Sequence, residues 1–305
     1  MIHRKKKFNW SLAANHRYLY GMLALPVIYY IVFCYVPMYG VTIAFRDYNL
    51  IKGVMGSPWI GLKYFRQYLA DAYFWKLVRN TLLLNLYNLV LSFPAPIILA
   101  LLLNELRHAR FKKLVQSVSY LPHFISTVVV CGMIVNFLAN DGLLNDVLAG
   151  LGFARQQFMM QPAMFRPIYV LSGIWQNVGW SSIIYLAAIT TVDVQLYEAA
   201  IVDGAGRFRQ MLSVTLPAIA PTVTVMLILA VGGMMSVGFE KILLLYNGST
   251  YEVSDVIATY VYRRGIQSTD FSYATAVGLF QSVVAFGFLY GTNKISSLLG
   301  ENSLW

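Results

Sequence analysis

The sequence is poor in charged residues. Asp, Glu, Lys and Arg make up only 12% of its 305 residues, whereas hydrophobic residues make up 58%. A soluble domain carries roughly 25% charged residues, so the low value excludes an ordinary soluble protein and predicts an integral membrane protein. The chain is expected to form one all-α bundle of membrane helices rather than several soluble domains.

The cysteine and histidine patterns of disulfide frameworks and metal sites are also missing. The two cysteines, Cys34 and Cys131, both lie in apolar runs, as small buried hydrophobic residues do. The four histidines lack the spacing of metal ligands. We therefore predict neither a disulfide-stapled fold nor a metal site.

Signatures of nucleotide binding and of ion coupling are absent as well. The chain has no GxxxxGK[ST] motif, and none of its lysines is followed by Ser or Thr, so it cannot form a P-loop of the usual kind. No acidic residue lies in the middle of an apolar run, which argues against an ion-coupled secondary transporter and against a membrane enzyme. We predict that the chain is not an enzyme and holds no cofactor of its own.

What the sequence does contain is a series of apolar segments long enough to cross a bilayer, which requires about 20 residues of helix. Prolines inside several of them are tolerable because neighbouring helices can satisfy the freed backbone groups. The first segment is too long for the core of a signal peptide and is expected to be retained. Short helices are predicted in the loops 58–75 and 241–269. The limits of the six predicted spans are roughly 18–45, 77–104, 114–139, 167–192, 214–239 and 271–296.

The positive charges predict an orientation. The net charge is +10, but the bases stand in blocks beside apolar segments, which is typical of topology signals and not of a nucleic-acid-binding face. Five bases precede the first segment, which favours a cytoplasmic N-terminus. We expect cytoplasmic tails at 1–17 and 297–305, a membrane domain over 18–296 and a cytoplasmic loop over 193–213.

That loop contains most of the stretch EAAIVDGAGRFRQMLSVTLP, from Glu198 to Pro217. Asp193 can cap the start of a helix, and Gly204 lets the chain turn out of it. A second short helix from Arg207 is expected to lead into the next span. On spacing alone, an ordinary amphipathic loop helix is an equally good interpretation.

The stretch resembles the EAA loop of the inner-membrane permeases of ATP-binding-cassette (ABC) importers. Glu198-Ala199-Ala200, Gly204 and Leu216-Pro217 stand at that family's spacing, and Val214 replaces its Ile. The resemblance implies a coupling helix that sits in a groove of an ATPase subunit. The residues that the resemblance assigns to coupling are Glu198, Ala199, Ala200, Asp203, Gly204, Leu216 and Pro217.

The resemblance extends over nearly the whole chain. YVPMYGVTIAFRDYN (35–49), SGIWQNVGW (172–180) and TYEVSDVIATYVYR (250–263) are similar to sugar-type permeases, above all to the poly- and oligosaccharide subgroup that includes alginate importers. This implies the type I importer fold in a bacterial inner membrane. It also implies a second homologous permease, a dimer of ATPase subunits that bind ATP and Mg²⁺, and an extracytoplasmic solute-binding protein.

Polar residues that face the bundle interior are candidates for the substrate path, because polar side chains are costly in lipid. Gly173, Asn177, Trp180 and Ile184 share one face of the fourth segment, where an amide can bond sugar hydroxyls and an indole can stack on a pyranose. The resemblance places the sugar beside this helix. Packing between helices is the alternative reading. Weaker candidates are Asn85, Asn88, Gln281 and Met234.

The sequence therefore predicts the permease subunit of an ATP-driven ABC importer that moves an oligosaccharide by alternating access. Its net positive outer loops are compatible with an acidic, alginate-like sugar. The alternatives are an ion-coupled secondary transporter or a channel and, among importers, a permease for amino acids or phosphate.

Overall fold

The described part of the protein is built from helices. The computed structural model describes residues 17–298, in which the only β structure is two isolated bridges, Arg46–Trp59 and Asn49–Gly53. Most of the predicted tails, 1–17 and 297–305, lies outside the described residues. Within residues 17–298, four continuous helices are long and apolar enough to cross a membrane: Tyr18–Phe45, Phe74–Glu105, Arg207–Gly232 and Phe271–Leu298.

Two bent helix pairs bring the possible spans in residues 17–298 to six, which agrees with the predicted number. The first pair is Ala109–Phe124 with Thr127–Phe137, bent by 99°. The second is Pro162–Thr190 with Val194–Val202, bent by 74°. In the second pair, the long helix matches the predicted fourth span, and the short one begins the loop that was predicted to follow it.

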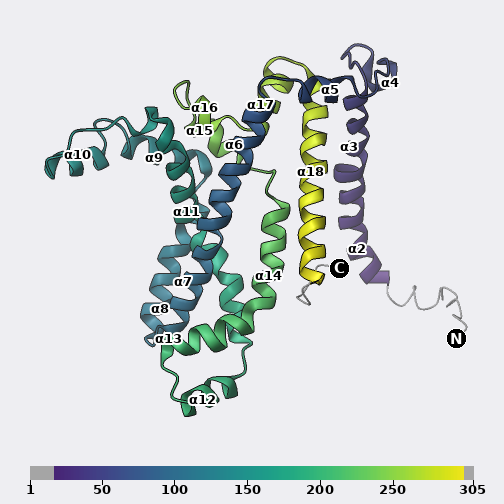
Figure 1. Ribbon diagram of the computed structural model, residues 1–305. Helices are drawn as coiled ribbons and strands as arrows, with labels where there is room; N and C mark the ends of the chain where they lie inside the picture. Colours follow the sequence, from purple (N-terminus) through teal and green to yellow (C-terminus); the bar gives the residue numbers. More distant parts are fainter. Residues whose placement is uncertain (1–16, 299–305) are drawn as a thin grey trace, which may run out of the picture.

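The long helices form two groups that meet at α14 (Leu216–Gly232), as Figure 1 shows. On one side, α14 and α11 (Pro162–Thr190) pack together, and α11 also contacts α7 (Pro94–Glu105) and α8 (Ala109–Tyr120). On the other side, α14 packs against α18 (Phe271–Leu298), which borders the first span. That span consists of α2 (Arg17–Tyr29), η1 (Tyr30–Tyr35), α3 (Val36–Met38) and η2 (Tyr39–Phe45).

Wide π-helical turns precede the prolines in three of the spans. They are η1, before Pro37; η3 (Asn88–Ser92), before Pro94; and η6 (Met211–Thr215), before Pro217. A proline has no N–H and its ring crowds the carbonyl of the preceding turn. A π turn widens the helix at that point, so the chain passes each proline without breaking the span.

The third predicted span, 114–139, is not one straight helix. It consists of α8, the 3₁₀ turn η4 (Leu121–Phe124) and α9 (Thr127–Phe137), with the bend at residues 125–126. Pro122 disturbs the backbone ladder, and Ser126 starts a new helix by accepting a hydrogen bond from the Val129 N–H at 3.4 Å. The side-chain amide of Gln176 donates to the freed Ile125 carbonyl at 3.1 Å.

The limits of the fifth predicted span, 214–239, are wrong at both ends. The helix already begins at Arg207, as α13 (Arg207–Gln210) and η6, and it ends at Gly232. Residues 233–238 are non-helical and lead to α15 (Phe239–Leu245). Two consecutive glycines weaken the helix here, and the side-chain amide of Gln281 on α18 donates to the Met235 carbonyl. That bond satisfies a backbone group that the unwound segment leaves free.

Short helices and a polar network close one end of the bundle. Asn80 on α6 (Phe74–Tyr87) is fully buried and donates to the carbonyls of Glu252 and Asp255, at 2.9 and 3.0 Å. Arg263 binds the Asp255 carboxylate through two hydrogen bonds of 2.8 and 2.6 Å. These contacts fix the loop 246–267 to the spans. The short helices at this end include α4 (Gly53–Gly56), α5 (Lys63–Leu69), α16 (Tyr251–Ser254), α17 (Ile257–Tyr262) and η7 (Arg263–Gln267), which fulfils the expectation for 58–75 and 241–269.

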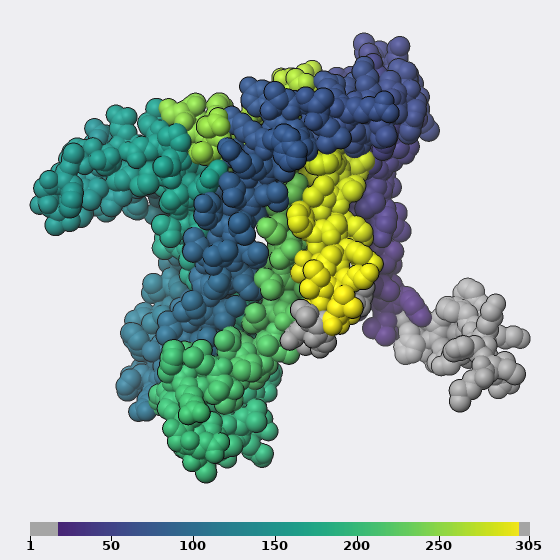
Figure 2. Space-filling view, in the orientation of Figure 1, coloured from purple at the N-terminus to yellow at the C-terminus, as the bar shows by residue number. Residues whose placement is uncertain are grey.

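Two elements project from this body (Figure 2). The connection from α9 to α11 extends to one side and contains α10 (Leu143–Gly150) and η5 (Phe158–Met160). At the opposite end from the polar network, α12 (Val194–Val202) protrudes between α11 and α13. The bundle therefore presents α12 at one end and the short helices α4, α5, α16 and α17 at the other.

Candidate functional site

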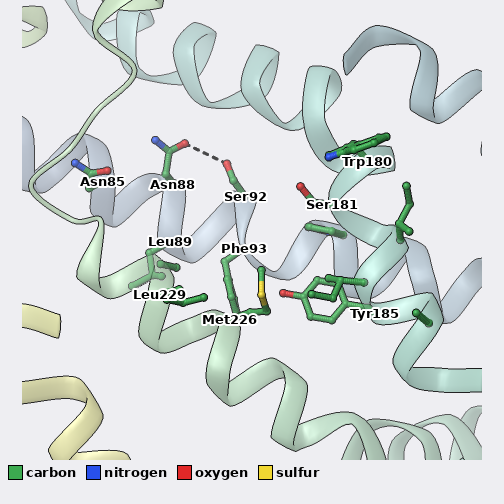
Figure 3. Close-up of a pocket in the computed structure, with 15 residues that line it drawn as sticks. Asn85, Asn88, Leu89, Ser92, Phe93, Trp180, Ser181, Tyr185, Met226 and Leu229 are labelled. Atoms are coloured by element: carbon green, nitrogen blue, oxygen red, sulfur yellow. Dashed lines mark hydrogen bonds between the residues drawn. The ribbon is translucent and has the colours of Figure 1, made fainter. Parts of the chain in front are cut away.

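A cavity of about 720 Å³ lies among α6, η3, α7, α11 and α14. Figure 3 shows Asn85, Asn88 and Ser92 on one wall, and Trp180, Ser181 and Tyr185 of α11 on another. Apolar side chains of α14 close the remaining wall, among them Met226 and Leu229.

A smaller, more polar cavity of about 260 Å³ adjoins the first. The two share Asn88, Ser92, Pro96 and Ser181. The walls that belong to the smaller cavity alone include Gly173 and Asn177 of α11, Tyr169, and Lys241 of α15. Taken together, the two cavities form one hollow with a polar end and an apolar end.

Most of the predicted path residues meet at this hollow. Asn85 and Trp180 line the larger cavity, Gly173 and Asn177 line the smaller, and Asn88 lines both. The spacing on the fourth span therefore places Gly173, Asn177 and Trp180 on one wall, as expected. Contact of these residues with a substrate stays a prediction.

The two remaining candidates lie elsewhere. Gln281 lines neither cavity, and its amide bonds the Met235 carbonyl across the gap between α18 and the unwound segment. Met234 belongs to that segment and also lines neither cavity. This hydrogen bond alone explains why the last span contains a polar residue at position 281.

Asn177 and Trp180 contact a histidine that the sequence did not single out. The ring of His123 stacks on the indole of Trp180, with centroids 4.7 Å apart and planes 2° apart, and Phe124 meets the indole edge-on at 5.5 Å. His123 Nδ1 lies 3.0 Å from Asn177 Oδ1, and Asn177 Nδ2 donates to the Gly173 carbonyl at 3.1 Å. The bend after η4 thus brings an aromatic and hydrogen-bonding group to α11. Trp180 remains 45% exposed, so part of its surface stays accessible.

The smaller cavity also contains a buried lysine, Lys241, at the start of the predicted loop 241–269. Lys241 is only 8% exposed. Its Nζ donates to the Tyr169 carbonyl at 3.1 Å and lies 5.1 Å from the centre of the Tyr169 ring. Burial lowers the pKa of Lys241 to about 8. No local pattern marks Lys241, because its position depends on the unwound segment that turns α15 towards α11.

The loop predicted for coupling has the expected local structure. The Asp193 carboxylate caps α12 by accepting from the Gln195 N–H at 2.9 Å. After α12, Gly204 turns the chain with φ of +74°, a conformation that favours glycine. Tyr197 and Thr215 hydroxyls lie 2.9 Å apart, and Arg207 pairs with Glu105 at the end of α7 at 3.2 Å. The first contact ties α12 to η6 at the start of the next span, and the second ties α13 to α7.

Little of α12 is covered by the rest of the described chain. Glu198, Ala199, Asp203 and Gly204 are exposed, and Ala200 is partly exposed. The loop also exposes six large apolar side chains: Val194, Leu196, Ile201, Val202, Phe208 and Leu212. Leu216 and Pro217 are not in the loop itself but at the start of α14, one π turn further along the same helix. No cluster of three or more potential metal ligands occurs in residues 17–298.

Comparison with known proteins identifies the family. Residues 68–291 match the family described as binding-protein-dependent transport system inner membrane component. The chain is 46% identical over 292 residues to the polygalacturonan/rhamnogalacturonan transport system permease protein YteP of Bacillus subtilis (strain 168), covering 95% of this chain and 91% of YteP. This chain therefore aligns with a permease over almost the full length of both proteins.

Solved structures agree with this match. One is the crystal structure of a bacterial ABC transporter involved in the import of the acidic polysaccharide alginate, with a TM-score of 0.87, 42% identity, and coverage of 94% of this chain and 98% of that one. Another is the bacterial alginate ABC transporter in complex with an alginate pentasaccharide-bound periplasmic protein, with a TM-score of 0.88, 40% identity, and coverage of 97% and 99%.

The chain belongs to the inner membrane components of binding-protein-dependent transport systems. It has the fold of an ABC importer permease, which confirms the predicted architecture.

Proposed function

We propose that this protein is the permease subunit of an ATP-driven importer that carries an acidic oligosaccharide across the bacterial inner membrane by alternating access. The single observation that carries the proposal is the uncovered α12 loop at the end of a bundle whose helices line a partly polar hollow. A helix with exposed apolar side chains and a fixed turn is suited to bind in a groove of another protein.

The transport of a sugar is supported by the lining of the hollow. Asn85, Asn88 and Asn177 present amides that can bond hydroxyl groups, and Trp180 presents an aromatic surface. YteP is named for polygalacturonan and rhamnogalacturonan, and the two solved importers for alginate; all of these polymers carry carboxylates. This favours an acidic sugar over amino acids or phosphate. An ion-coupled transporter or a channel is not favoured, since the chain aligns with importer permeases throughout.

The proposed complex contains several other chains. A second, homologous permease would complete the membrane path, and two ATPase subunits would bind ATP and Mg²⁺ and receive the α12 loops. A solute-binding protein would deliver the sugar from outside, as the alginate importer's complex with a periplasmic protein supports. In this arrangement α12, loop 193–213 and both tails lie in the cytoplasm, as the bases before the first span favour.

A pull-down from native membranes in mild detergent tests the proposal. The tagged wild-type chain should bring down a second permease and an ATPase subunit. Ala200→Trp places a bulky side chain on α12 and should release the ATPase while the second permease stays. Ala149→Trp is the matched control, because Ala149 is exposed on α10, away from α12. Recovery of the chain alone, or only with copies of itself, would contradict the proposal.

A further inference from the structure

Lys241 is a buried cation. None of the ion pairs among residues 17–298 includes it. Lysine is almost never buried to this degree unless it is paired, since removing an ammonium from water is costly. The aromatic ring and the carbonyl of Tyr169 offset only part of that cost.

The ammonium has donors to spare, and they adjoin a cavity. It carries three N–H groups and, within the described part of the chain, makes one hydrogen bond, to the Tyr169 carbonyl. Lys241 lines the smaller cavity together with Asn88, Gly173 and Asn177. A Cβ at Gly173 would lie 3.5 Å from Lys241 Nζ, so the glycine leaves open the space directly beside the charge. Glu240, the acidic residue next to Lys241 in the sequence, is exposed and forms no ion pair with it among the described residues.

We infer that Lys241 is a specificity-determining residue that binds the carboxylate of one uronate unit of the transported oligosaccharide. The inference rests on the proposed function and identifies the substrate class that the hollow selects. A bound carboxylate would supply the missing counter-charge, and the ammonium would donate charge-assisted hydrogen bonds to it. Asn88 and Asn177, on the same cavity, are placed to bond the hydroxyls of that unit.

The charge is present under ordinary conditions. With a pKa of about 8, most of the Lys241 side chains are protonated at pH 7. The groups that face it are Tyr169 of α11, which bonds it, and the buried thiol of Cys131 on α9; neither carries a negative charge at that pH. The exposed Glu240 on its own helix can be solvated instead.

The test uses the complete importer, with both permeases, the ATPases and the binding protein, in proteoliposomes. Uptake of an oligogalacturonide is compared with uptake of the same oligomer after its carboxyl groups have been reduced to alcohols. Three variants are measured: Lys241→Met, Lys241→Arg and the control Lys113→Met. Lys113 is an exposed lysine on α8 that lines neither cavity.

We expect Lys241→Met to lower uptake of the acidic oligomer by about ten-fold or more, as the loss of one charge-assisted hydrogen bond does. Uptake of the reduced oligomer and basal ATPase activity should change little. Lys241→Arg should retain most of the acidic uptake because it keeps the charge, and Lys113→Met should match the wild type.

Several results would overturn the inference. Unchanged acidic uptake in Lys241→Met would do so, and so would equal losses in the Met and Arg variants or for the acidic and reduced oligomers, since these indicate a structural role. A wild-type importer that takes only neutral sugars would refute the role of Lys241 and the acidic character of the proposed sugar, but it would leave standing an ATP-driven sugar importer. A wild-type complex that imports no sugar would refute both.

Discussion

The turn after α12 offers a sharp test of the coupling loop, because Gly204 and Gly206 stand two residues apart and differ in backbone conformation. Gly204 has φ of +74°, and a Cβ there would meet nothing within 4 Å. Gly204→Ala therefore adds no clash, and its cost is the backbone strain alone, about 1–2 kcal/mol. The N–H groups of Gly204 and Ala205 close the end of α12 on Ile201 and Ala200 carbonyls, at 3.0 and 2.8 Å. The substitution should weaken this closure.

A change of that size lowers the ratio of the closed turn to open conformations of the loop by a factor of roughly 5–30. Uptake per ATP hydrolysed by the reconstituted importer should fall several-fold, while membrane insertion stays normal. Gly206→Ala is the matched control, since Gly206 has φ of −68° and equally open surroundings. Gly204→Asn should restore part of the coupling because Asn tolerates the left-handed conformation. Equal coupling ratios for Gly204→Ala and Gly206→Ala would refute the reasoning.

Three further predictions concern packing, the polar network and pH. A Cβ at Gly179 would collide with the Ser119 carbonyl oxygen, so Gly179→Ala should destabilise the contact of α8 with α11 by about 1–3 kcal/mol and lower the thermal midpoint in detergent. Gly278→Ala, in open space, should not. Asn80→Leu should expose loop 246–267 to proteolysis, because each buried polar group left unpaired costs about 1–3 kcal/mol. Since Lys241 is charged below its pKa of about 8, acidic-sugar uptake should decline between pH 7 and 9 in the wild type and stay level in Lys241→Arg, with basal ATPase activity as the reference.

Local signals in the sequence were sufficient for much of the architecture. Apolar runs of more than about 20 residues located the spans, because a helix of that length crosses the bilayer and satisfies its own backbone hydrogen bonds. The α12 loop could also be predicted, since Asp193 and Gly204 act on the backbone within a few residues of themselves. On α11, helical spacing alone brought Gly173, Asn177 and Trp180 to one wall of the hollow.

Features that depend on distant contacts could not be predicted. The bend at residues 125–126 is supported by Gln176, and the unwound segment 233–238 by Gln281; each partner lies on another helix, far along the chain. The positions of His123 and Lys241 follow from these two irregularities. A proline or a pair of glycines within a span indicates a weak point, but whether the helix bends, bulges or stops there depends on its neighbours.

The hollow and the α12 loop are connected by the same two helices, which is the physical condition for coupling within one chain. α11 is continuous over 29 residues, about 43 Å, and its only internal proline, Pro167, lies near its start. Its far end leads directly into α12, while α13 and α14 leave the loop on the other side, and both α11 and α14 line the larger cavity. The bond from Tyr197 to Thr215 fastens the loop to η6, directly before α14, and the ion pair from Arg207 to Glu105 fastens it to α7, which is a further wall. A displacement of α12 must therefore move walls of the cavity, unless the bulge at η6 absorbs it on the α14 side.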